Sequence, residues 1–313
     1  MTLPDGSTTQ ALVPQVYVAV KTGDLNSNGQ LLSGALISAN SINLNITGDL
    51  NNSNGTIAGR TVLALNANNI NNLGGRLTAN DVNVHANNDL NNLGGSIDAQ
   101  HSLIASAGHD LNVITSTSTQ SNATGSRTNI NRVAGLYVTG IQKTEDTGQK
   151  TDTSASLILS AGHDLHLDGA QIMSAAGNTS QTILQAGHDL SLGIFKTFEQ
   201  NNITWNSKNH LNQGSSIDNG TQIQSNGDIT LNAGHDANLK AASIESGNSN
   251  AASNSSNTGG KLAINAANSI NITTGQASQN FDEAQQLKSK QICTSVTTYT
   301  CKLNGFIVLV ALR

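Results

Sequence analysis

The chain has 313 residues, of which 36% are hydrophobic, 3% aromatic and only 11% charged, against about 25% charged in an average domain. The 15 lysines and arginines are scattered singly and the net charge is −5, so no basic stripe is available for nucleic-acid phosphates. The low charge also argues against an ordinary disordered tail. Residues 1–5 lack the basic and apolar regions of a signal peptide, and the apolar run 306–312 is too short to span a bilayer.

After an entry segment at 1–22, the region 23–114 contains 20-residue repeats. The aligned positions are Leu50, Ile70 and Leu90; Asn51, Asn71 and Asn91; Asn52, Asn72 and Asn92; Gly55, Gly75 and Gly95; Ile57, Leu77 and Ile97; Gly59, Ala79 and Ala99. An earlier copy is predicted to align Ile37, Ala39, Ile42 and Leu44 with Ile57, Gly59, Val62 and Ala64.

Apolar residues alternate over short stretches within each unit, as in Val82-Asn83-Val84, which is the period of a strand with one buried face. The Asn-Asn and Gly-Gly pairs are interpreted as turns between strands. One unit cannot bury its own apolar face, whereas stacked units can. The sequence therefore predicts an all-β fold, specifically a right-handed parallel β-helix (solenoid) with extruded β-hairpins or loops.

Stacking also accounts for the 42 asparagines, because identical side chains one above another can hydrogen-bond in a ladder. Two other repeat architectures fit less well. The leucine-rich pattern LxxLxLxxN does not recur, and the calcium-binding nonapeptide GGxGxD is missing.

The region 115–275 is marked by the tetrapeptide Ala-Gly-His-Asp, which occurs four times in the chain, at 107–110, 161–164, 186–189 and 233–236. Two polar interruptions, near 115–154 and 194–226, are predicted to leave the stack as hairpins or loops. The serine- and asparagine-rich run 247–260 is predicted to be a further loop. Residues 276–313 are an atypical C-terminal tail, and the hypothesis is a frameshift near Gln291.

The early units resemble filamentous-haemagglutinin repeats. The stretches LIASAGHDLNVITSTSTQSN, RVAGLYVTG, LILSAGHDLHLDGAQIMS and QGSSIDNGTQIQSNGDITLNAGHD resemble the second class of haemagglutinin repeat. Together the resemblance covers about residues 16–275. It points to the haemagglutinin-repeat exoproteins of two-partner secretion, which include adhesins and contact-dependent inhibition proteins. Neither the N-terminal secretion domain of that family nor a toxin domain is recognised in this sequence.

The resemblance implies export through an outer-membrane two-partner secretion transporter and a secreted protein at the bacterial cell surface. It further implies a structural stalk that contacts a target-cell or host-cell surface and presents or delivers a C-terminal toxin. The alternative is an adhesin segment that binds host receptors or glycans. A more distant alternative is a polysaccharide-acting β-helix enzyme. Fold does not separate these functions.

The histidines of the repeated tetrapeptide are His109, His163, His188 and His235, and they recur at matching turn positions, so some of them are expected to stack. They raise the question of a metal site, which needs three or four converging ligands. A turn role is the preferred interpretation, in which glycine permits the tight backbone and aspartate accepts hydrogen bonds from local amides. No metal, cofactor or small-molecule substrate is therefore predicted.

Catalytic residues are not predicted either, because Glu145, Glu199, Glu245 and Glu283 are far apart and most aspartates fall at repeat turns, as do Asp49, Asp89, Asp110 and Asp164. The expectation is that the chain is not an enzyme. The aromatic residues of the interruptions are expected to pack the hairpins onto the stack, with partner binding as the alternative. They are Tyr137, Phe195, Phe198 and Trp205. Cys293 and Cys301 lie in the atypical tail.

Overall fold

The computed structural model describes residues 34–140, 142–144, 150–152, 154–177, 179–247 and 260–286. The chain separates into two compact units, 1–33 and 34–313, and every described residue belongs to the second. Those residues form an all-β structure with no helix, so no helical membrane span occurs among them. The entry segment 1–22, Glu145, most of the run 247–260 and the tail from 287 onward lie outside the described residues.

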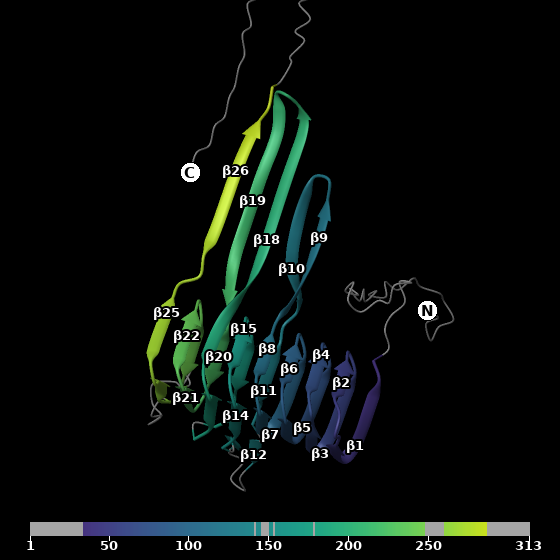
Figure 1. Cartoon of the computed structure of the whole chain (residues 1–313), viewed down its shortest axis with the longest axis vertical. Helices are drawn as coiled ribbons and strands as arrows, with labels where there is room; N and C mark the ends of the chain where they lie inside the picture. The colour runs from purple at the N-terminus through teal and green to yellow at the C-terminus, as the bar shows by residue number, and fades with distance from the viewer. Residues whose placement is uncertain are drawn as a thin grey trace, which may run out of the picture. The chain divides into compact units, whose positions relative to one another are not determined.

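Most strands belong to two 12-stranded sheets, in which strands from successive repeat units pair in parallel, side by side (Figure 1). The first sheet starts with four long bent strands, β1 (Leu36–Asn45), β3 (Thr56–Ala67), β5 (Arg76–Ala86) and β7 (Ser96–Ala107). Beyond β7 each long strand is replaced by two short ones, so the sheet divides into two rows. Residues 96–99 pair with the next strand of one row and residues 102–107 with the next strand of the other.

The rows are defined by their pairing partners. Row one continues as β11 (Gly135–Val138), β16 (Gln171–Ser174), β20 (Gln222–Ser225) and β23 (Ser243–Ser246). Row two continues as β14 (Ser156–Ala161), β17 (Gln181–Ala186), β21 (Asp228–Ala233) and β24 (Leu262–Ala266). Row three, in the second sheet, contains β2 (Leu50–Ser53), β4 (Ile70–Leu73), β6 (Leu90–Leu93), β8 (Leu111–Ile114), β15 (Leu165–Asp168), the start of β18 (Leu190–Asn206), β22 (Asp236–Lys240) and β25 (Ser269–Thr273).

The 20-residue register is confirmed for rows one and three, where Ile57 pairs with Leu77 and Ile70 with Leu90. The alignment of the earliest copy is wrong by one residue in row two. Ile42 pairs with Leu63 and not with Val62, because a bulge between the two rows adds a residue to β3. Since side chains alternate between faces, this shift turns Leu63 inward and leaves Val62 38% exposed.

Inward positions of all three rows form one continuous aliphatic core. Leu90 of β6, Ile97 and Leu103 of β7 and Leu111 of β8 are all fully buried. The alternation predicted from the sequence is seen in β15, where Leu165 and Leu167 are buried on either side of the partly exposed His166.

The asparagine pairs are strand residues, so their interpretation as turns is wrong. Asn51 and Asn52 lie in β2, and the corresponding pairs lie in β4 and β6. The second asparagine of each pair faces inward: Asn72 and Asn92 are 1% and 0% exposed. Hydrogen bonds between stacked amides satisfy these buried groups, which outweighs the usual depletion of asparagine in strands.

Two hairpins leave the parallel sheets between rows three and one and form an antiparallel sheet with each other. They are β9 (Ser116–Asn122) with β10 (Gly125–Arg132), and the long β18 with β19 (Asn209–Gly220). Strand β10 pairs with β18, and β26 (Ala277–Ala284) pairs with β19 (Figure 1). Residues at the beginning of the expected tail therefore continue the ordered fold.

The structure places β11 in row one, so the expected interruption 115–154 consists of two separate excursions. The first is the β9–β10 hairpin. The second, between β11 and β14, contains the short antiparallel pair β12 (Gln142–Thr144) and β13 (Lys150–Asp152). The interruption near 194–226 likewise ends earlier, because β20 already belongs to row one.

Asp218 connects the long hairpin to the parallel sheets. Its side chain is 1% exposed and lies 3.5 Å from the Lys196 Nζ of β18 and 3.3 Å from the Lys240 Nζ of β22. The backbone amide of Gln276, just before β26, donates to Asp218 Oδ2 at 3.1 Å. Desolvation raises the pKa of Asp218, but the Gln276 amide and the two lysines outweigh it, so the net pKa lies below its usual value.

Candidate functional site

The four Ala-Gly-His-Asp segments form equivalent turns between rows two and three, stacked one on another. Each glycine approaches the turn below closely: a Cβ on Gly162 would lie 2.0 Å from the carbonyl oxygen of Gly108, and one on Gly187 would lie 2.0 Å from that of Gly162. Glycine is therefore required by the spacing between turns, because no larger residue allows this approach.

The histidines of these turns stack in a single column. Ring centroids are 4.9 Å apart for His109 and His163, 5.1 Å for His163 and His188, and 4.8 Å for His188 and His235. The rings are nearly parallel, with interplanar angles of 1°, 4° and 6°. These spacings are those of hydrogen-bonded strands, about 4.8 Å, so the ladder of strands sets the ladder of rings.

Aspartates alternate with the rings. His163 Nδ1 lies 3.2 Å from Asp110 Oδ1 of the unit below and 3.3 Å from Asp164 Oδ2 of its own turn. The other three histidines repeat this pattern with separations of 3.2–3.4 Å. We call this array the histidine–aspartate ladder. Its members are His109, His163, His188 and His235 with Asp89, Asp110, Asp164, Asp189 and Asp236.

Four of the five ladder carboxylates, Asp89, Asp110, Asp164 and Asp189, also accept a backbone hydrogen bond from the next turn, whereas Asp236 accepts one from the side chain of Asn268. The amide of Asp164 donates to Asp110 Oδ1 at 3.1 Å, and that of Asp236 donates to Asp189 Oδ1 at 3.0 Å. The turn role expected for these aspartates is thus correct in kind, but the amides belong to the neighbouring unit and are not local. The Asp236 amide, with His235 and His188, holds the pKa of Asp189 below its usual value despite some desolvation.

The other candidate residues do not converge on one site. Glu199, Glu245 and Glu283 lie on β18, β23 and β26, respectively. Among the aromatics, Tyr137 is on β11 and donates from its hydroxyl to Gln171 Oε1 at 3.1 Å. Burial raises the pKa of Tyr137, with a further contribution from the charge of Asp98.

The hairpin aromatics have different environments. Phe195 packs against the turn at Gly169, where a Cβ would lie 2.0 Å from its ring, so it fastens the hairpin to the parallel sheets. Phe198 is half-buried within the antiparallel sheet. Trp205, near the end of β18, is 61% exposed and is not covered by the described residues.

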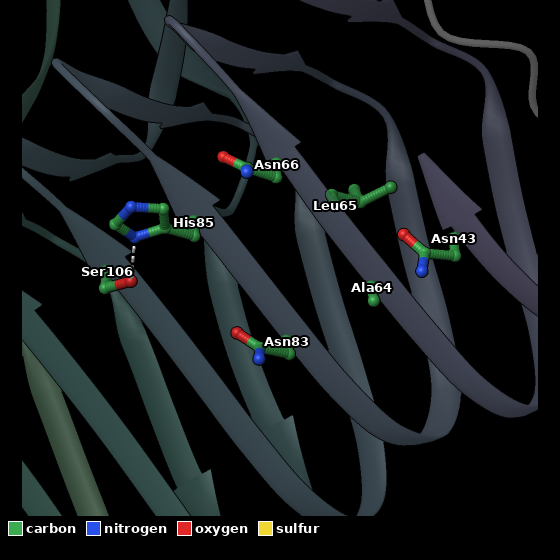
Figure 2. Close-up of a pocket in the computed structure, with 7 residues that line it drawn as sticks. All are labelled: Asn43, Ala64, Leu65, Asn66, Asn83, His85 and Ser106. Atoms are coloured by element: carbon green, nitrogen blue, oxygen red, sulfur yellow. Dashed lines mark hydrogen bonds between the residues drawn. The ribbon is translucent and has the colours of Figure 1, made fainter. Parts of the chain in front are cut away.

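The outer face of row two carries a polar hollow that was not predicted from the sequence (Figure 2). It has a volume of about 420 Å³ and is lined by Asn43, Ala64, Leu65, Asn66, Asn83, His85 and Ser106. His85 Nδ1 and Ser106 Oγ are hydrogen-bonded at 2.8 Å, as Figure 2 shows. Apart from Leu65, which is a core residue, the lining residues occupy outward positions of β1, β3, β5 and β7, and only the three-dimensional pairing of those strands brings them together.

Comparison of this chain with protein-family models, with curated proteins and with solved structures found no match.

Proposed function

We propose that the repeat units form a right-handed parallel β-helix and that this segment is a structural stalk of a secreted bacterial surface exoprotein. In the proposed role, the stalk presents or delivers a C-terminal toxin in contact-dependent inhibition, after export through an outer-membrane two-partner secretion transporter. The main support is the in-register parallel pairing of successive units in three rows around one aliphatic core. The proposal of family and function also draws on the sequence resemblance of residues 16–275.

The stalk role is consistent with the way the repeat units use their inward positions and their turns. The repeats devote their inward positions to the core and their turns to contacts between units, as in the histidine–aspartate ladder. The polar hollow of row two contains no carboxylate, and a hollow of the antiparallel sheet contains a single one, Glu199, beside Arg127. An array of this kind supports extension by repetition better than it supports catalysis.

Deleting codons 34–286 in frame from the native locus tests the delivery role. Inhibition of neighbouring susceptible cells should be lost, while immunoblots of whole cells confirm that the remaining exoprotein reaches the surface. Reading the locus beyond both ends provides the companion test, since a toxin with a small immunity gene is expected. Undiminished inhibition by the deletion strain would contradict the proposed delivery role.

One observation favours an adhesin segment as the second candidate: the exposed indole of Trp205 on the long hairpin. Exposed tryptophans are frequent anchors in protein and glycan binding. Beads coated with the chain should then adhere to host cells, and Trp205→Ser should reduce that adherence. Met173→Ser is the control, because Met173 is another exposed apolar residue. Phe195→Ser is unsuitable as a control, because it is expected to loosen the hairpin.

A further inference from the structure

We propose that the histidine–aspartate ladder binds Zn²⁺ at two places per chain. One site consists of His109, Asp110 and His163, and the other of His188, Asp189 and His235. In each, two stacked imidazoles and the carboxylate between them offer ligand atoms that all lie within 4.8 Å of one another. Nitrogen and carboxylate oxygen are the ligand types that Zn²⁺ takes from histidine and aspartate.

The ligand separations fit a tetrahedral ion. Zinc bound at about 2.0–2.1 Å requires ligand atoms about 3.3–3.4 Å apart. In the first site, Asp110 carboxylate oxygens lie 3.3 Å from His109 Nδ1 and 3.2 Å from His163 Nδ1. In the second, Asp189 Oδ1 lies 3.3 Å from His188 Nδ1 and 3.2 Å from His235 Nδ1.

In the second site one oxygen, Asp189 Oδ1, faces both histidines, whereas in the first site His109 faces Asp110 Oδ2 and His163 faces Asp110 Oδ1. The two Nδ1 atoms of each site must come closer together, and in the first site one oxygen must also approach the second histidine. The two Nδ1 atoms are at most 4.8 Å apart and their rings are nearly parallel. Both rings must therefore rotate until their planes meet at the ion, because the Nδ1 lone pair lies in the ring plane. The imidazoles can tilt because they are partly solvent-exposed, with 47–54% of each side chain accessible. Water can reach the remaining coordination position from the same side.

The carboxylates are held in place before an ion binds. Asp110 accepts the Asp164 amide through Oδ1, which leaves Oδ2, the oxygen nearer His109, without a backbone donor. In Asp189, Oδ1 accepts the Asp236 amide and also faces both histidines of the second site. Because neighbouring turns already position the ligands, binding requires little ordering of the chain.

The number of ions follows from the number of Nδ1 atoms. The central triad His163, Asp164 and His188 has similar geometry, but each Nδ1 can bind one ion only. Filling the central triad would leave His109 and His235 without a histidine neighbour, whereas filling the two outer sites uses all four rings. The ladder is thus expected to hold two ions, each joining the turns of two stacked units.

Zinc binding should have two consequences besides occupancy. The ion bonds to the folded stack and not to the unfolded chain, so the melting temperature should rise with Zn²⁺ concentration. Each histidine must present an unprotonated Nδ1, so binding should release protons.

The experiment measures zinc per chain by equilibrium dialysis and metal analysis, with Co²⁺ absorption as an independent test of nitrogen and oxygen coordination. All proteins carry Cys293→Ser and Cys301→Ser, because thiols also bind zinc. We expect two ions in this background, one in His109→Ala and none in the double variant His163→Ala/His188→Ala. Circular dichroism and thermal unfolding without zinc establish that each variant is folded.

The control variants remove histidines that lack the paired arrangement. His101 has a single carboxylate neighbour, Asp81, at 2.9 Å, and His85 is bonded to Ser106. His166→Ala completes the set, since His166 Nε2 lies 3.8 Å from Asp164 Oδ2, beside the central triad. All three variants should retain two ions. The proposal is overturned by fewer than two ions in the background protein, by loss of an ion in these controls, or by zinc that persists in the double variant.

Discussion

Asn72 donates a hydrogen bond of 2.7 Å from Nδ2 to the Oδ1 atom of Asn92, which lies 20 residues further along the chain and directly above it in the stack. Asn52 makes the equivalent bond to Asn72 at 2.8 Å, so the three amides form a buried ladder. A second, more exposed ladder runs through Asn51, Asn71, Asn91 and Asn112. Because the first ladder is buried and the second is partly exposed, the loss of an amide should lower the stability of the fold more in the first than in the second.

Asn72→Ala should destabilise the fold by about 2–3 kcal/mol, because it leaves the buried Oδ1 of Asn92 without its donor and opens a small cavity. Urea unfolding followed by circular dichroism measures this change. Asn71→Ala is the matched control in the outer ladder, where water replaces the lost partner, and it should cost about 1 kcal/mol or less. Equal losses in both variants would contradict the assigned faces.

Leu90→Asp tests the core register. Leu90 is fully buried between stacked units, so the substitution places an unpaired carboxylate in the core and should cost more than about 4 kcal/mol. The exposed Asn88, two residues earlier, provides the control: Asn88→Asp should cost less than about 1 kcal/mol. Protease resistance of the folded chain ranks the two variants, and similar resistance would count against the register.

Gly162→Ala tests the close approach of the stacked turns. The added methyl group would lie 2.0 Å from the carbonyl oxygen of Gly108, so the two turns must separate, at a cost of about 2 kcal/mol or more. Gly48→Ala is the control, since a Cβ there meets nothing within 4 Å. Thermal unfolding should show a lower midpoint for Gly162→Ala alone. An unchanged midpoint would mean that the turns are further apart than described.

Asp168→Asn should stabilise the protein at neutral pH. Burial raises the pKa of Asp168, an effect that His166 opposes only in part. A carboxyl with a raised folded-state pKa loses stability as pH rises through its unfolded value of about 3.9 and then its folded value. The variant should therefore melt at a higher temperature than the parent at pH 7, and the difference should shrink as pH falls below about 4. A lower midpoint for the variant at pH 7 would exclude this account.

Asp218→Ala should release the long hairpin while leaving the parallel sheets intact, because Asp218 joins β19 to Lys196, Lys240 and the Gln276 amide. Limited proteolysis at pH 7 should cut the variant within 194–220 faster than the parent. The pKa of Asp218 is lowered in the fold, so this connection is present above its unfolded pKa and is lost as pH falls through the folded value. Protection of 194–220 equal to that of the parent would show that the hairpin is held without Asp218, through Phe195 and through the pairing of β18 with β10 and of β19 with β26.

The periodicities of the sequence were enough to predict short alternating strands and most of their register, but not the strands β2, β4 and β6, whose asparagine pairs were interpreted as turns. Residues that alternate along a strand and recur after 20 positions, such as Ile70 and Leu90, must occupy the same face of successive units if they are to be buried. The inward orientation of Asn72 escaped this reasoning, because local propensity treats an asparagine pair as a turn and takes no account of an identical amide stacked above it.

Recurrence of the tetrapeptide at matching turns indicated that some of its histidines stack. Only the tertiary structure decided that all four form one column and that the interruptions form an antiparallel sheet. His109 and His163 are 54 residues apart in sequence and stack at 4.9 Å, because the β9–β10 and β12–β13 excursions leave the stack and return to it without disturbing its spacing. The pairing of β10 with β18 similarly joins two interruptions that no shared period relates. Repetition in the sequence shows which residues of successive units are equivalent. The contacts between two inserted hairpins have no such period, because they depend on where the stacked units place the start and end of each hairpin.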